Sequence, residues 1–138
     1  MTWFEHFDLH KIVLKGRPVR YRVTPSSEWQ AHPQRPVLVL LHGFPQTHVL
    51  WHRVAQRLRS HYRLVMPDLR GYGESSCELG EADHANYSKR AMAQEIIDLL
   101  DTLGVDDFYL CGHDRGGRVS HRLALEHGSR LRKMCVLD

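Results

Sequence analysis

A run of five apolar residues, Val37 to Leu41, constrains the fold of this chain more than any other feature. A strand with one face in water alternates apolar and polar residues, whereas a continuous run suits a strand that is buried on both faces. Such strands occur in parallel sheets that are covered by helices. The run is the longest apolar stretch in the chain, and it is far too short to span a membrane. We therefore expect no membrane partner.

The segments around this run alternate between strand and helix patterns. Residues 9–23 predict two short strands that turn at residues 15–18, and the proline-rich residues 24–36 predict a loop. The other expected elements are a helix over 48–59, a strand over 63–67, a loop from 68 to about 87, a helix from Met92 to Leu103 closed by Gly104, a strand over 108–112, a helix over 115–127 and a strand over 133–137. This order predicts an α/β fold with a mostly parallel, twisted sheet and helices on both faces.

The length of 138 residues predicts one domain at most. A parallel strand normally returns through a helix, but Asp138 comes at the end of a predicted strand. We therefore expect residues 1–138 to be the N-terminal portion of a longer core domain, truncated before its last strands. An open apolar edge at the last strand predicts self-association, or pairing with a complementing C-terminal half.

Composition excludes several function classes. Nineteen Lys and Arg residues against sixteen Asp and Glu residues give a net charge of +3, which is spread along the chain. Because no aromatic residues interleave with the basic residues of the segment 115–132, we expect no nucleic-acid partner. Three cysteines and an N-terminus that lacks a secretory pattern predict reduced thiols and a cytoplasmic location.

The main chemical motif is Gly112-His113-Asp114-Arg115-Gly116, between a predicted strand and a predicted helix. The spacing Gly-x-nucleophile-x-Gly is that of a nucleophile elbow, with Asp in place of Ser. The start of the following helix would bring backbone N–H groups and the positive end of the helix dipole to Asp114. The alternative is that Asp114 is a helix N-cap, a position for which Asp is well suited.

A second motif, His42-Gly43-Phe44-Pro45, follows the buried strand directly. Glycine there would let a backbone N–H approach a developing oxyanion, although a plain strand-to-helix turn is the alternative. The glycine-containing segment 68–75 predicts a structural connector without obvious chemistry. His48 and His52, four residues apart, are a weak metal pair without the glutamate of a zinc protease, so we expect no metal and no cofactor.

The order of HGFPQT, PDLRGYGES and GHDRGGRV resembles the branch of the α/β-hydrolase fold that contains epoxide hydrolases and dehalogenases. The stretches HGFPQTHVLWHRVA, SKRAMAQEIIDLLDTLG and GHDRGGRVSHRLALEH are most similar to the fluoroacetate (haloacetate) dehalogenases. The resemblance implies an Asp nucleophile, here Asp114, and an alkyl–enzyme ester that is later hydrolysed. It implies a small 2-haloacid as the substrate, with an epoxide as the alternative.

Arg115 stands where related epoxide hydrolases usually have Trp, and Arg118 follows one helical turn later. In the family that the chain resembles, the equivalent pair holds the substrate carboxylate, for which a bidentate guanidinium is suited. The alternative is that both are surface partners of acids such as Glu126 or Asp68.

The resemblance implies roles for three further groups. The amides of Phe44 and Arg115 would form the oxyanion hole, and Asp138 would be the triad acid that orients a catalytic His. That His and the lid would lie beyond residue 138. A further alternative is therefore an inactive or split hydrolase fragment.

Overall fold

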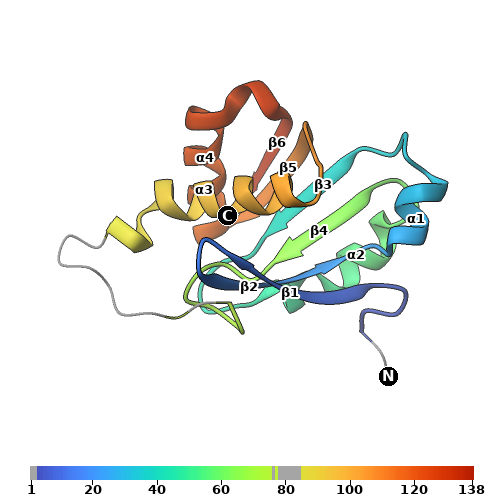
Figure 1. Ribbon diagram of the computed structural model, residues 1–138, viewed down its shortest axis with the longest axis horizontal. Helices are drawn as coiled ribbons and strands as arrows, with labels where there is room; N and C mark the ends of the chain where they lie inside the picture. Colours follow the sequence, from blue (N-terminus) through green and yellow to red (C-terminus); the bar gives the residue numbers. More distant parts are fainter. Residues whose placement is uncertain (1–2, 76, 78–84) are drawn as a thin grey trace.

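One six-stranded sheet forms the centre of the computed structural model, which describes residues 3–75, 77 and 85–138. The strands lie in the order β1-β2-β4-β3-β5-β6 (Figure 1). Their bounds are Asp8–Leu14 for β1, Arg17–Val23 for β2, Val37–Leu41 for β3, Arg63–Pro67 for β4, Phe108–His113 for β5 and Leu131–Leu137 for β6. The strands expected from sequence are thus all present.

The last four strands of this order run parallel. β3 pairs in parallel with β4 and β5, and β5 pairs in parallel with β6, whereas β1 and β2 join the sheet antiparallel. Leu41 lies opposite Gly112, and His113 lies opposite Leu137. Because the carboxyl ends of parallel strands meet at one edge of a sheet, the residues that follow β3, β5 and β6 come together there.

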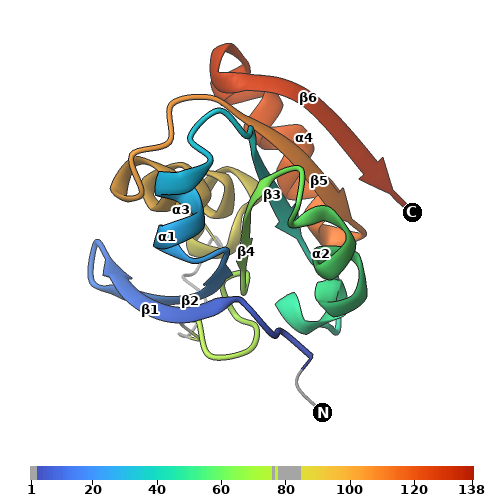
Figure 2. The ribbon, with the colours of Figure 1, turned by 90° about the vertical axis from the view of Figure 1, so that its right-hand side faces the viewer.

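Helices cover both faces of the sheet, as predicted. α3 (Lys89–Thr102) and α4 (Arg115–His127) lie on one face, and α2 (His52–Leu58) lies on the other (Figures 1 and 2). The short elements are α1 (Ser26–Ala31) and the 3-10 turns η1 (His48–Trp51), η2 (Ala85–Tyr87) and η3 (Gly128–Arg130). No helix among the described residues is long and apolar enough to cross a bilayer.

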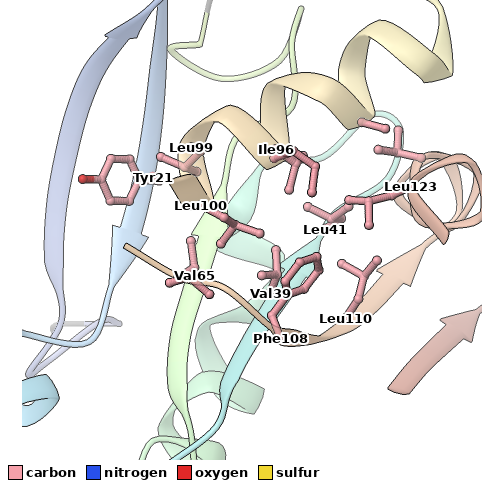
Figure 3. Packing of buried hydrophobic residues seen from close by; sticks show 14 of the residues in the cluster. Tyr21, Val39, Leu41, Val65, Ile96, Leu99, Leu100, Phe108, Leu110 and Leu123 are labelled. Atoms are coloured by element: carbon pink, nitrogen blue, oxygen red, sulfur yellow. The ribbon is translucent and has the colours of Figure 1, made fainter. Parts of the chain in front are cut away.

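Successive side chains of β3 point to opposite faces of the sheet and so belong to two separate hydrophobic layers. Val39 and Leu41 point toward α3 and α4, where they pack with Leu100 and Leu123 (Figure 3). Leu40 belongs to the opposite layer, beneath η1 and α2. This double burial explains why β3 has no polar residue.

α3 begins at Lys89, three residues before the expected start at Met92, and ends at Thr102, next to the expected end at Leu103. The Ser88 hydroxyl accepts a hydrogen bond from the Ala91 amide at 3.1 Å, which caps the first turn. At the other end Gly104 has a φ of 73°, a conformation that glycine adopts without a steric cost. Apolar residues spaced three and four apart, including Ile96 and Leu100, face the core.

Two expectations about local structure were wrong. Residues 24–36 do not form a plain loop, because α1 occupies Ser26–Ala31. Trp29 packs against the core from this helix, and its indole N–H donates to Thr24 Oγ1 at 2.7 Å. Pro25, at the N-cap with a φ of −60°, leads into the helix instead of preventing it.

The second error concerns the buried side of the segment 48–59. Leu50, Val54 and Leu58 recur every four residues and, with Trp51, predict one buried helix face, yet the Leu50 and Val54 side chains are exposed. Trp51 is buried as this spacing predicts, together with His48 and Ala55. The segment begins as the 3-10 turn η1 before α2 starts, which rotates the later residues relative to one continuous α-helix.

The thiols are free, as expected. Cys111 and Cys135 lie opposite each other on β5 and β6. Burial, with the neighbouring Cys135 thiol, raises the pKa of Cys111 to about 12. A thiol with that pKa stays protonated and is a poor nucleophile at neutral pH.

Candidate active site

Asp114 occupies the sharp turn between β5 and α4. Its φ of 54° and ψ of −116° are unusual for a residue with a side chain. Its amide donates to the Leu137 carbonyl at 3.1 Å, which fixes the turn against β6. The carboxylate is exposed and makes no capping hydrogen bond to α4. The turn therefore presents the Asp114 side chain to solvent. Asp114 occupies the N-cap position of α4, but its carboxylate does not cap the helix, so the N-cap alternative does not explain this side chain.

Two glycines allow the chain to pack this closely around Asp114. A Cβ on Gly43 would lie 2.5 Å from Asp114 Cβ and 2.9 Å from Asp114 Oδ2. A Cβ on Gly116 would overlap the carbonyl oxygens of Leu41 and His42. The end of β3 thus touches the start of α4, which only residues without a side chain permit.

This contact brings the amide predicted for the oxyanion hole onto Asp114. The Phe44 N–H donates to Asp114 Oδ2 at 3.0 Å. The Phe44 amide and, after it, the nearby Arg115 amide lower the pKa of the Asp114 carboxyl. The carboxylate is thus ionised at neutral pH, with Oδ2 held by the loop after β3.

Arg115 directly follows Asp114, and Arg118 lies one helical turn further along α4. The Arg115 guanidinium donates to the Tyr72 hydroxyl at 3.2 Å and lies 4.8 Å above the Phe44 ring. Arg118 lines an open hollow of about 630 Å³ together with Asp114. In the part of the chain that the structure describes, neither guanidinium pairs with a carboxylate.

The acids named as alternative partners of these arginines have other contacts. Glu126 pairs with Arg90 and Arg122, and Asp68 pairs with Arg20 and His48. Neither of the two acids named in that alternative therefore pairs with Arg115 or Arg118.

Asp138 reaches the same hollow from the next strand. It follows β6 and lines the hollow together with Asp114. The geometry is compatible with a second carboxylate near the elbow. Its role as a triad acid stays a prediction.

The loop over 68–75, predicted to be a simple connector, supports the site. The buried Asp68 carboxylate accepts hydrogen bonds from the His48 amide and from His48 Nδ1, both at 2.8 Å, and from Arg20 Nε at 2.9 Å. Burial alone would raise the pKa of the Asp68 carboxyl, but these bonds outweigh it and hold the pKa well below its usual range. His42 Nε2 accepts a hydrogen bond from the Leu69 amide at 2.9 Å.

These contacts fix the segment 42–48, which carries the Phe44 amide. Sequence reasoning missed them because His48 and Asp68 come from separate loops. The available signal was the position of Asp68, a charged residue directly after a buried strand.

His48 and His52, the pair weighed as metal ligands, have hydrogen-bond partners within the protein. His48 Nδ1 is hydrogen-bonded to Asp68, and His52 Nδ1 lies 2.9 Å from the Val49 carbonyl oxygen. Among the described residues, no group of three or more potential ligands could hold a metal ion.

The elbow, the glycine turn after β3 and the parallel sheet together form a recognisable family pattern. A family model described as the alpha/beta hydrolase fold matches residues 36–138. The chain belongs to this family. The α/β-hydrolase fold therefore accounts for the sheet order and for the strained turn at Asp114.

Individual relatives include two enzymes. A Burkholderia fluoroacetate dehalogenase is 54% identical over 103 residues, which cover 75% of this chain and 34% of that protein. A soluble epoxide hydrolase from Corynebacterium is 33% identical over 129 residues, which cover 94% of this chain and 41% of that protein.

A solved structure shows the same arrangement. A crystal structure from Salmonella enterica, provisionally named an acyltransferase, has a TM-score of 0.90 at 41% identity and covers all of this chain and 44% of its own. The chain thus spans less than half the length of each of these three relatives.

Proposed function

We propose that this chain carries the nucleophile of a hydrolase that removes halide from small 2-haloacids. The observation that carries the proposal is the exposed Asp114 carboxylate, held by the Phe44 amide instead of capping α4. The guanidinium groups of Arg115 and Arg118, which form no ion pair with a described residue, and the 54% identity to a fluoroacetate dehalogenase support a carboxylate-bearing substrate.

In the first step, Oδ1 of Asp114 attacks the carbon that bears the halogen. The carbon–halogen bond breaks, the halide leaves with the bonding electrons, and an ester forms between Asp114 and the acid. An ionised carboxylate needs no base for this attack. Arg115 and Arg118 would hold the substrate carboxylate so that this carbon faces Oδ1.

In the second step, water attacks Cγ of Asp114 and releases the hydroxyacid. The carbonyl oxygen of the ester becomes the oxyanion, and it is Oδ2, which the Phe44 amide already contacts. The Arg115 amide would be the second donor. We propose that residues 1–138 are part of a longer core domain, and that the general base for the water comes from the remainder. Asp138 would orient that base.

A single turnover in ¹⁸O-labelled water tests the proposal in a protein extended to the length of its relatives. Limiting fluoroacetate should give fluoride and unlabelled glycolate, with ¹⁸O in the Asp114 carboxylate. Asp114→Asn should release no fluoride, whereas the exposed, distant Asp106→Asn should behave as the parent. Label in the first glycolate released would overturn the covalent mechanism. Diol formation from an epoxide without fluoride release would identify an epoxide hydrolase instead.

A further inference from the structure

Lys89 stands in an unfavourable place for a cation. It is the first residue of α3, directly after the Ser88 cap, where the partial positive charge of the helix N-terminus disfavours it. Its side chain is half-buried, and among residues 3–75, 77 and 85–138 it makes no ion pair. Nothing in helix stability accounts for a lysine here.

The same side chain lines two hollows next to the elbow. Lys89 lines the hollow of about 630 Å³ that contains Asp114 and Arg118. It also lines a smaller hollow of about 250 Å³ with Phe44 and Arg115. Lys89 therefore lies close to both guanidinium groups, where α3 packs beside α4 (Figure 1).

The three cations repel one another. Burial, together with the charges of Arg115 and then Arg118, lowers the pKa of Lys89. A bound anion would relieve this repulsion. A carboxylate substrate also has to approach the negative Asp114, and a third cation would offset that second repulsion.

We propose that Lys89 is a third cationic residue of the substrate site and that it determines a preference for anionic over neutral substrates. This inference rests on the proposed function. Arg115 and Arg118 grip the substrate carboxylate, and Lys89 counters the repulsion between that carboxylate and Asp114. The effect belongs mainly to binding, because the same repulsion is present before the bond to carbon forms.

The kinetic test compares Lys89→Gln with Arg90→Gln in the protein extended to the length of its relatives. Arg90 is the next residue of α3, but its side chain is 71% exposed and pairs with Glu126, away from Asp114. With chloroacetate, Lys89→Gln should raise KM by roughly tenfold and leave kcat nearly unchanged, as for the loss of one close charge. Turnover of neutral chloroacetamide should stay as in the parent, and Lys89→Arg should restore KM.

Equal effects of Lys89→Gln and Arg90→Gln on chloroacetate, or an equal loss on chloroacetamide, would overturn the proposal. Acetate binding, followed by the NMR shifts of the arginine Nε–H groups, supplies a readout that does not depend on turnover. Lys89→Gln should weaken acetate binding, and no acetate binding by the parent would also overturn the inference. Weakened acetate binding in a protein that releases no halide would support the anion site and reject the proposed function.

Discussion

At the residue scale, the site depends on a close approach that only glycine allows. Gly43 lies against Asp114, so a methyl group added there must push the elbow away from the loop that carries the Phe44 amide. Overpacking of this kind costs about 1–3 kcal/mol. We therefore expect Gly43→Ala to lower the urea midpoint of unfolding. It should also raise the pKa of the Asp114 carboxyl, measured by carboxyl NMR, because the Phe44 amide moves away from the carboxylate.

Gly128→Ala is the matched control for that substitution. Gly128 has a φ of −58°, and a Cβ there would meet no atom within 4 Å. Alanine fits this backbone, so the change should stabilise the protein by about 0.4–1 kcal/mol and leave the Asp114 pKa unchanged. A Gly43→Ala protein that matched the Gly128→Ala protein in both measurements would contradict the close approach at the elbow.

At the scale of elements, Asp68 joins three parts of the structure. It follows β4, accepts hydrogen bonds from His48 in η1, and pairs with Arg20 of β2. Its carboxyl has a lowered pKa in the folded state, against about 3.9 when unfolded. The stability from this group is therefore complete at neutral pH and is lost as the pH falls through and below the unfolded value.

Asp68→Asn should remove that pH dependence along with the ion pair. Breaking a buried pair by removing one partner costs about 3–5 kcal/mol, so the urea midpoint at pH 7 should fall sharply. Between pH 6 and pH 3 the midpoint of the parent should fall more steeply than that of the variant. Glu126→Gln, at an exposed ion pair, should change the midpoint little at pH 7. Parallel curves for the parent and Asp68→Asn would show that Asp68 is not a source of acid sensitivity.

The same elements show what the sequence could and could not predict. β3 was predicted correctly because double burial leaves an uninterrupted apolar run. The position of the sharp turn at Asp114 was predicted because such a turn needs glycines at fixed spacing, whereas the catalytic role of Asp114 stays a prediction. α1 was missed because a few prolines predict a loop, although Trp29 anchors a short helix. The contact between His48 and Asp68 joins two loops, and no local pattern encodes such a pairing.

At the scale of the whole molecule, β6 is an edge of the sheet in the described structure. It pairs with β5 alone, and Met134, Val136 and Leu137 are 40%, 54% and 43% exposed. Cys135 lies beside them in a hollow of about 640 Å³ between β6 and α2. An apolar edge with unpaired backbone groups is a site where a second strand can add.

We therefore expect the 138-residue chain to self-associate through β6. Its apparent size in sedimentation should rise with concentration, and Met134→Lys should reduce the association because charge on an edge strand opposes strand pairing. Leu125→Lys is the matched control, since Leu125 is 64% exposed but lies on α4. Equal solubilisation by both variants would indicate a general effect of charge, whereas a parent chain that stayed monomeric at every concentration would show that the edge is protected without a partner.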